Sequence, residues 1–340
     1  MTRVAVVGAT GNVGTALLRR LQAEEAVTGI VGIARRIPDR SADPYAGVEW
    51  HSVDVGADGA VAALTPLLEH VDAVVHLAWA LQPTHDIPTQ YRVNVEGTAA
   101  VLEAAAAAGV GQVVVASSVG TYRAADKRLR VDESWPVDGM ATATYSIHKA
   151  LNEAALDEFA DTHPDIVVTR LRPGLVFQQP AAAEIRGLFL GHLVPMRVVR
   201  AARWAVLPLP GPFVFQAVHA DDLADAYWRT IDQRAAGAFN IAAGPVLTPP
   251  RLAAVLGMRR AVRIPLRLLR AVVTLTWHLR IQPTDAGWID IAANVPIMRT
   301  DKAREELGWE PQHTAVEAFA DLVEGFRQGS SVPASGPLRG

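Results

Sequence analysis

The stretch Arg3-Val4-Ala5-Val6-Val7-Gly8-Ala9-Thr10-Gly11-Asn12-Val13-Gly14 decides the fold of this chain. It opens with an apolar run typical of a short buried strand, and an amphipathic helix is expected over about 13–24. Gly8, Gly11 and Gly14 lie between them, allow a tight turn and let backbone amides approach a pyrophosphate. Because the strand and the helix that such a motif requires both flank it, the sequence predicts a dinucleotide-binding turn.

Apolar strands and helical segments alternate along the first half of the chain. Strands are expected near residues 3–7, 30–34, 48–53, 73–77, 112–117 and 166–171. The alanine-rich stretch 99–108 is interpreted as a helix that stops at Gly109. This order predicts an α/β fold with a doubly wound parallel sheet of the Rossmann type.

The sequence changes character after Phe177, where prolines interrupt apolar stretches. We expect a dinucleotide-binding domain over 1–177, to which 214–244 returns with a further helix and strand. Residues 178–213 and 245–329 are expected to form a smaller substrate-binding region that is discontinuous in sequence. Residues 330–340 are interpreted as a flexible tail.

The end of the second expected strand bears on the choice of cofactor. An acidic residue there normally accepts hydrogen bonds from the adenosine ribose, and this chain has Ala34-Arg35-Arg36 instead. Ala34 removes a carboxylate that would repel a 2′-phosphate, while Arg35 and Arg36 offer guanidinium donors to bind one. The sequence therefore favours NADP(H) over NAD(H), with solvated arginines of no special role as the alternative.

Tyr145 and Lys149 stand four residues apart in a segment expected to be helical, so their side chains share one face. An ammonium beside a phenol lowers the phenol pKa from about 10, towards the range of general acid and base chemistry. The strand upstream ends in Ser117 and Ser118, at the edge where an open α/β sheet binds its ligand. Together these groups predict a proton-transfer site.

The chain resembles the short-chain dehydrogenase/reductase superfamily, in its extended, epimerase/dehydratase-like type, over nearly its whole length. Besides the motifs above, the resemblance rests on segments that occur in the family's order: Asp54-Val55, His76-Leu77-Ala78-Trp79, Asn94-Val95-Glu96-Gly97-Thr98, Leu171-Arg172-Pro173-Gly174, Val218-His219-Ala220-Asp221-Asp222-Leu223-Ala224, Phe239-Asn240-Ile241 and Leu307-Gly308-Trp309-Glu310-Pro311.

This resemblance implies a role for each candidate catalytic residue. Ser118, four residues before Tyr122, would hydrogen-bond the reacting oxygen, and Ser117 is the less suitable serine. Tyr145 would donate or accept the proton, while Lys149 would lower its pKa and bind the nicotinamide ribose. The implied cofactor-binding residues are Gly8, Thr10, Gly11, Asn12, Val13, Gly14, Ala34, Arg35, Arg36, Asp54, Val55, Leu77, Ala78, Trp79, Asn94, Ala116, Tyr145, Lys149, Pro173 and Gly174.

Two positions depart from the family pattern. Trp79 stands where the family usually has a small residue, so it either narrows the cofactor site or shapes the substrate mouth; a simple buried aromatic is the alternative. Phe177 is followed by Gln178-Gln179-Pro180 rather than the Gly-Pro common in nucleotide-sugar members. The second departure weakens an assignment to nucleotide sugars.

Composition limits the classes of function. The 340 residues include 32 Lys and Arg against 35 Asp and Glu, so no basic excess points to nucleic acid. Zero cysteines exclude disulfides, zinc-thiolate sites and a thiol nucleophile. The first strand begins almost at once, which leaves no room for a signal peptide, and a cytoplasmic enzyme is expected. A homodimer is a family expectation.

The apolar segment 264–281 also carries three arginines and a histidine, which argue against a spanning helix. We interpret it as a lid or packing helix, with a membrane-surface helix as the less favoured alternative. If it lines the active-site mouth with Trp204, Phe213, Phe215 and Trp277, the substrate is bulky and apolar.

His219 and Asp222 invite a metal or triad interpretation, which we do not favour. Asp222 is expected to cap a helix and His219 to pack locally, so no metal site is predicted.

The function predicted is hydride transfer between NADP(H) and a carbonyl or alcohol of a mainly hydrophobic small molecule. The alternatives are a nucleotide-sugar epimerase or dehydratase with tightly bound NAD, and a non-catalytic NADP(H)-binding regulator or assembly subunit.

Overall fold

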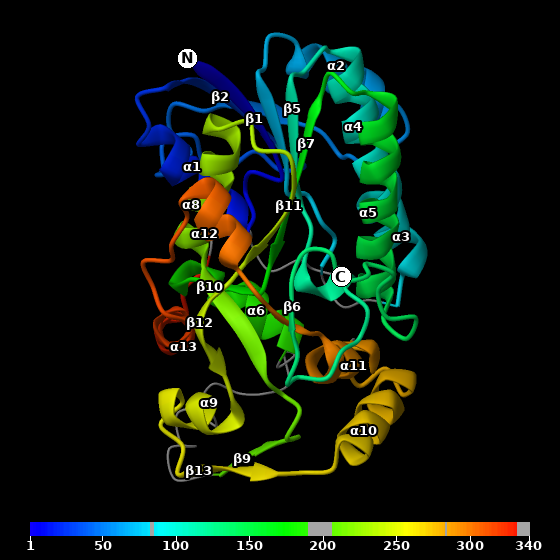
Figure 1. The fold of residues 1–340 in the computed structure, drawn as a ribbon, viewed down its shortest axis with the longest axis vertical. Helices are drawn as coiled ribbons and strands as arrows, with labels where there is room; N and C mark the ends of the chain where they lie inside the picture. The colour runs from blue at the N-terminus through cyan, green and yellow to red at the C-terminus, as the bar shows by residue number, and fades with distance from the viewer. Residues whose placement is uncertain (82–84, 190–205, 283, 332–340) are drawn as a thin grey trace.

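A seven-stranded parallel sheet forms the centre of the molecule in this computed structural model, which describes residues 1–81, 85–189, 206–282 and 284–331 (Figure 1). Its strand order is β11-β7-β5-β4-β1-β2-β3, and every neighbouring pair is parallel. The strands are β1 (Thr2–Val7), β2 (Val27–Ala34), β3 (Glu49–Ser52), β4 (Ala73–His76), β5 (Gln112–Ala116), β7 (Val167–Pro173) and β11 (Gly237–Ile241). The predicted doubly wound α/β fold is confirmed.

The sheet has a switch point between β1 and β4. From β1 the chain moves outward to β2 and β3, then crosses back to add β4, β5 and β7 on the other side. Loops leaving β1 and β4 therefore turn to opposite faces and open a crevice at the carboxyl ends of the strands. This crevice is where the fold places a ligand.

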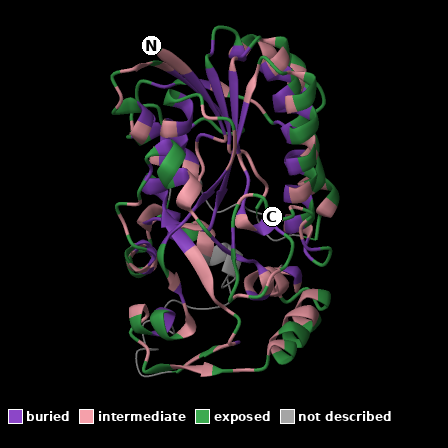
Figure 2. Cartoon of the chain, viewed as in Figure 1, coloured by how far each residue is buried: buried purple, intermediate pink, exposed green. Residues whose placement is uncertain are grey.

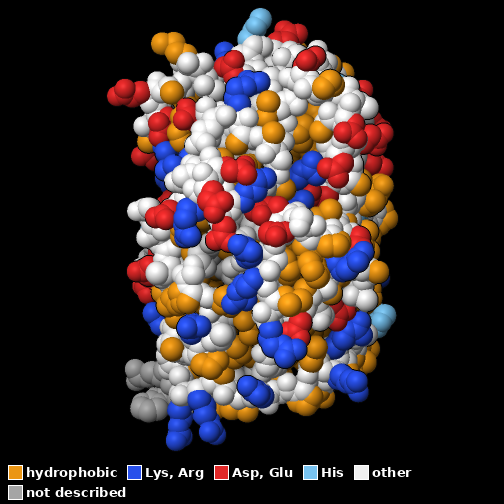
Figure 3. Space-filling view, in the orientation of Figure 1, with side chains coloured by type: hydrophobic (Ala, Val, Ile, Leu, Met, Phe, Trp, Pro, Cys, Tyr) orange, Lys and Arg blue, Asp and Glu red, His pale blue; other side chains and the backbone are white. Residues whose placement is uncertain are grey.

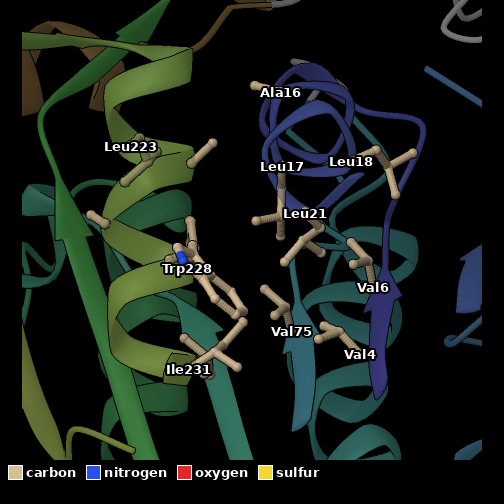
Figure 4. Packing of buried hydrophobic residues seen from close by; sticks show 14 of the residues in the cluster. Val4, Val6, Ala16, Leu17, Leu18, Leu21, Val75, Leu223, Trp228 and Ile231 are labelled. Carbon is tan, nitrogen blue, oxygen red and sulfur yellow. The ribbon is translucent and has the colours of Figure 1, made fainter. Parts of the chain in front are cut away.

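Helices cover both faces of this sheet (Figure 1). On one face lie α1 (Asn12–Gln22), α8 (Ala220–Asp232) and α12 (Asp301–Leu307), and on the other α2 (Ala60–Leu68), α4 (Gly97–Ala107) and α5 (Thr144–Thr162). Figure 4 shows leucines of α1 facing Trp228 and Ile231 of α8, above Val4 and Val75 of the sheet. The strands between the layers are buried (Figure 2).

Smaller sheets and helices build the rest of the molecule. The three-stranded sheet orders β12 (Ala243–Leu247), β10 (Phe215–His219) and β8 (Leu175–Phe177), and two pairs join β13 (Arg260–Arg263) with β9 (Val206–Leu209) and β14 (Ile297–Met298) with β6 (Arg130–Val131). The remaining helices within the described residues are α3 (Ile87–Tyr91), η1 (Arg92–Glu96), η2 (Val119–Thr121), η3 (Gln179–Ala181), α6 (Ala182–Phe189), α9 (Pro249–Val255), α10 (Leu266–His278), α11 (Gly287–Asn294) and α13 (Ala315–Gln328).

The segment 214–244 contributes both to the seven-stranded sheet with its helices and to the three-stranded sheet. Its helix α8 and strand β11 join the large sheet and its layers, whereas β10 pairs with β8 and β12 instead. Residues 190–205 and the predicted tail beyond Ser331 lie outside the described residues.

The helix α8 begins differently from the sequence-based prediction. His219 caps it, because its ring nitrogen accepts a hydrogen bond from the Asp221 backbone at 3.2 Å. Asp222 was expected to be the cap, but it lies inside the first turn. Its carboxylate accepts backbone N–H groups of Gln312 and His313, at 3.1 and 2.9 Å. Asp222 thus ties α8 to the chain before α13.

None of the helices described by the structure is long and apolar enough to cross a bilayer.

Candidate active site

The turn after β1 passes close to the residues that follow β4. Gly8 has φ of +90°, and a Cβ there would lie 2.5 Å from the Ala78 backbone nitrogen. A Cβ on Gly14 would lie 2.5 Å from the Gly8 carbonyl oxygen. Both positions therefore require glycine for backbone packing, as the motif predicts. Gly11 differs, since its nearest neighbour would be the Gly8 oxygen at 3.6 Å.

The first turn of α1 presents backbone amides with no competing carboxylate. Gly11 is its N-cap, no side chain caps it, and no acidic residue lies in its first turn. Asn12 instead bridges the turn to β8, donating to the Val176 oxygen at 3.2 Å and accepting from Gln178 at 2.7 Å. The helix dipole and the amides fit a pyrophosphate at this end, so the residues present suit a dinucleotide.

The ends of β2 and β3 carry the residues that the sequence predicts to contact the adenosine. Ala34 is buried at the end of β2, and Arg35 and Arg36 follow it as exposed side chains. Asp54 after β3 is also exposed, and its carboxylate accepts the Gly56 backbone N–H at 3.0 Å. The end of β2 itself carries no carboxylate in the position where an acidic residue normally binds the adenosine ribose.

Tyr145 lies at the start of α5, between two tryptophans. Its ring centroid is 5.7 Å from that of Trp79 and 5.1 Å from that of Trp288 in α11. Burial raises the pKa of Tyr145 to about 12, and a hydrogen bond with Ser118 opposes that rise. Ser118 also accepts the Gly120 backbone N–H at 3.0 Å. The structure thus brings the predicted tyrosine and serine into contact.

Lys149 is held away from the tyrosine ring. Its Nζ donates to the Ala116 carbonyl oxygen at 2.6 Å and lies 3.5 Å from the centroid of the Trp79 ring, compared with 6.0 Å from that of Tyr145. Burial lowers the pKa of Lys149 to about 7, against the opposing charge of Glu153. In this arrangement burial has the largest effect on the pKa of Tyr145, and the lowering of that pKa by Lys149 stays a prediction.

A buried charge cluster fixes α5 to the sheet. The Glu153 carboxylate accepts hydrogen bonds from Arg170 at 2.9 Å, Arg172 at 2.8 Å and Ser117 at 2.5 Å. Although burial disfavours the charged form, the two guanidiniums hold the pKa of Glu153 at about 2. Ser117 is therefore committed to this cluster rather than to the crevice. Sequence reasoning missed the cluster, for which two arginines two positions apart on one face of a buried strand, Arg170 and Arg172, were the available signal.

Asn94 controls the loop that follows β4. Its amide is buried, accepts the Ala80 backbone N–H at 2.6 Å and donates to the Ala80 oxygen at 3.2 Å. Trp79 directly precedes Ala80, so these two hydrogen bonds of Asn94 fix the backbone from which the indole extends.

The other predicted cofactor residues occupy structural positions around the crevice. Leu77 donates its backbone N–H to Val7 at 2.7 Å, and Val55 packs against Gly97. A Cβ on Gly174 would lie 2.5 Å from the Gln216 oxygen, so β10 requires glycine there. Pro173 is buried at the end of β7.

A cavity of about 20 Å³ lies beside Tyr145, enough for one water molecule. Its lining comes from the loop after β4, from α3, η1 and α5, and from α11 and the residues just before it. It consists of Trp79, Ala80, Leu81, Gln90, Asn94, Thr144, Tyr145, His148, Asp285 and Trp288. Burial raises the pKa of Asp285 and lowers that of His148. Tyr145 thus lines a cavity that is large enough for a single polar group.

Phe215 and Trp277, two of the four aromatic residues expected at the mouth, do not line the cavity beside Tyr145. Phe215 packs in the core between the small sheet and α13, and Trp277 stacks on His85 with ring centroids 4.7 Å apart. Trp204 lies outside the described residues. The tryptophan that reaches Tyr145 from the second half of the chain is Trp288, which no local pattern marked.

The fold and this site define a dinucleotide-dependent oxidoreductase of the short-chain dehydrogenase/reductase type. A model of the NAD dependent epimerase/dehydratase family matches residues 4–242, and the chain belongs to that family. The resemblance stated from the sequence is thereby confirmed.

Two relatives and one solved structure illustrate which proteins this chain is similar to. The chain is 26% identical to UDP-glucose 4-epimerase of Mycolicibacterium smegmatis, over 96% of this chain and 99% of the relative. It is 29% identical to a 3-diazoavenalumate denitrifying reductase of a Streptomyces species, over 92% and 96%. The structure of UDP-glucose 4-epimerase from Thermotoga maritima with UDP-glucose has a TM-score of 0.70 at 20% identity, over 96% and 99%, and shows likeness of fold.

Proposed function

We propose that this enzyme uses NADP(H) to reduce a ketone or aldehyde, or to oxidise the corresponding alcohol, on a mainly apolar small molecule. The observation that carries this proposal is the position of Tyr145, whose ring lies between the Trp79 and Trp288 rings beside a cavity of one polar group's size. Two indole walls favour an apolar or aromatic substrate whose single oxygen meets the phenol.

Each catalytic side chain has a proposed task. Ser118 and Tyr145 hydrogen-bond the substrate oxygen from one side, and Tyr145 gives or takes its proton. Lys149, beside the Ala116 oxygen, holds the nicotinamide ribose, and its charge stabilises the phenolate when the two groups approach. NADP(H), when bound, supplies or accepts the hydride.

The proposed preference for NADP(H) rests on the end of β2. Arg35 and Arg36 are exposed there, next to buried Ala34, so two guanidiniums are available to a 2′-phosphate and no carboxylate repels it.

A nucleotide-sugar epimerase with retained NAD is the second candidate. The relative named UDP-glucose 4-epimerase, which matches the chain from end to end, favours it. Against it stands the tryptophan at position 79, which lies over Lys149 and narrows the space beside Tyr145.

Calorimetric titration with NADPH and NADH tests the cofactor, and nicotinamide absorbance with panels of ketones, aldehydes and nucleotide sugars tests the chemistry. We expect tighter binding of NADPH, and the double variant Arg35→Ala, Arg36→Ala to lose roughly ten- to a hundredfold of it. Arg40→Ala, an exposed arginine of the same loop, is the matched control.

Carbonyl-dependent oxidation of NADPH supports the reductase. Tight NADH binding without net oxidation, together with conversion of a nucleotide sugar, would establish the epimerase instead.

A further inference from the structure

Charge is distributed unevenly along this chain. Residues 245–284 contain seven arginines and no Asp or Glu, whereas the remainder carries 25 Lys and Arg against 35 Asp and Glu. The seven arginines are all exposed. Within the part of the chain that the structure describes, Arg270 alone among them pairs with a carboxylate, that of Asp290 at 2.9 Å. This segment is therefore a strongly cationic surface on a chain whose net charge is −3.

The same segment presents an apolar stripe to solvent. Leu268, Val272, Leu275 and Leu279 follow one another at intervals of four, three and four residues, so they share one face of α10 and the turn that ends it. They are 50% to 61% exposed, and no residue of α10 is buried. Ile281, just beyond the helix, is 52% exposed and extends the patch.

The opposite face of α10 anchors the helix to the protein. Arg270 bonds Asp290 of α11, and Trp277 stacks on His85 while its carbonyl oxygen contacts the histidine ring nitrogen at 3.2 Å. The stripe is thus the outward face of a helix that is already seated. Figure 1 places α10 and β13 together at the lower end of the molecule, and Figure 3 shows basic and hydrophobic side chains gathered over that end.

We propose that α10 docks this enzyme on an anionic lipid surface. Aliphatic side chains on one helical face, with Arg267 and Arg280 beside them and Arg263 just before the helix, match what the boundary between headgroups and acyl chains accepts. The helix has 13 residues, about 20 Å at 1.5 Å per residue, so it lies in the surface and does not span it.

The positive charge of residues 245–284 favours an anionic lipid surface over a second copy of the chain as the partner of α10. Two copies that met through α10 would bring together two sets of exposed arginines, of which Arg270 alone has a carboxylate partner among the described residues, and like charges repel. Lipid phosphates neutralise the arginines while the acyl region receives the leucines. An anionic lipid surface therefore accounts for both the exposed arginines and the apolar stripe.

Co-sedimentation of the full chain with vesicles tests the proposal. Vesicles of equimolar phosphatidylcholine and phosphatidylglycerol are compared with vesicles of phosphatidylcholine alone. We expect binding to the anionic vesicles, weakened by salt, and at least tenfold weaker binding to the zwitterionic ones.

Two sets of variants separate the apolar and the charged contributions. Leu275→Asp with Leu279→Asp should abolish sedimentation, and Arg263→Gln with Arg267→Gln should weaken it about fivefold for each arginine. Leu129→Asp, at an exposed leucine outside the segment, is the matched control and should bind as the parent does. All these positions are exposed, and equal thermal midpoints verify that each variant folds.

Failure to sediment with anionic vesicles overturns the proposal, as does sedimentation that the Leu275 and Leu279 changes leave intact. Sedimentation velocity identifies a competing occupant: a dimer that those two changes dissociate would assign the stripe to a second copy and also overturn it. Retention on an immobilised acidic protein, without vesicle binding, would assign the surface to a protein partner.

Discussion

The ammonium nitrogen of Lys149 lies 3.5 Å from the centroid of the Trp79 ring, at cation–π distance. It also donates to the carbonyl oxygen of Ala116 at the end of β5. The lysine is therefore held between an indole and a strand end, in a site dry enough to lower its pKa to about 7.

This burial predicts that stability depends on pH through Lys149. Its pKa in the folded protein is about 7, compared with 10.5 for the ordinary side chain, so the unfolded chain binds more protons between these values. Stability should therefore rise as pH increases from 7 to 10.5, by up to about 5 kcal/mol from this group. In Lys149→Met that contribution to the pH dependence is absent. Lys127 still makes a contribution of the same kind in the variant, because burial also lowers the pKa of Lys127 to about 7.

Urea unfolding at several pH values measures the difference between parent and variant. Lys302→Met controls for the loss of a lysine elsewhere. Parallel pH dependence of parent and Lys149→Met would contradict the burial of a charge at this position.

Tyr145→Phe should lose turnover and retain dinucleotide binding. The hydroxyl is the only group of Tyr145 that the substitution removes, and general acid or base catalysis contributes about 10²- to 10⁴-fold. Steady-state rates and calorimetric titration check the two expectations. Unchanged turnover would refute the assignment of the proton to this residue.

Tyr122→Phe is the matched control for that experiment. The Tyr122 hydroxyl is buried, donates to Asn240 at 2.7 Å and accepts from Arg172 at 2.9 Å. Its loss should lower the free energy of unfolding by about 1–3 kcal/mol without the catalytic defect. A defect as large as that of Tyr145→Phe would show that tyrosine loss in general disables the site.

Gly11→Ala should impair the cofactor site and leave the fold intact. Gly11 has φ of −78°, which alanine adopts, and the new Cβ would lie 3.6 Å from its nearest neighbour. Its methyl group would stand where the pyrophosphate is expected to approach, so dinucleotide affinity should fall at least tenfold. Gly29→Ala, on β2, is the control, because its new Cβ would lie 3.5 Å from its nearest neighbour, the Arg3 side chain. Equal affinity of both variants would place the pyrophosphate elsewhere.

Glu153→Gln should be strongly destabilising. Arg172 has its charge compensated by Glu153 inside the protein, and removing one partner of a buried pair costs about 3–5 kcal/mol. Because the pKa of Glu153 is held at about 2, its contribution should be present above about 4.5 and lost as pH falls from 4.5 towards 2. Chemical unfolding at neutral and acid pH measures both effects. Glu158→Gln, an exposed change on the same helix, should be neutral, and equal stability of the two variants would contradict the cluster.

Local patterns predicted the sheet well, because they are set by neighbours in sequence. Gly8 and Gly14 are required by contacts within the turn and with the residues that follow β4, the neighbour of β1 in the sheet, and the apolar runs became β1, β4 and β5. Tyr145 and Lys149 share a helix, so their presence at one site followed from spacing alone.

Contacts between distant segments were beyond such patterns. Trp288 reaches Tyr145 across 143 positions of sequence, and the choice of Trp288 over Trp277 depends on how α10 and α11 pack. Asp222 was misassigned for a similar reason, since its partners are the backbone amides of Gln312 and His313. The arrangement of Lys149 depended on Trp79, whose indole fills space that a small residue leaves open.

The Glu153 cluster divides the active site into a fixed wall and an adjustable one. Helix α5, which carries Tyr145 and Lys149, is fastened through Glu153 to Arg170 and Arg172 of β7 in the core. The opposite wall, with Trp79 and Trp288, comes from a loop and a short helix at the surface. New substrates should therefore be accommodated by substitutions on that second wall, while the geometry of proton transfer is preserved as selectivity diverges.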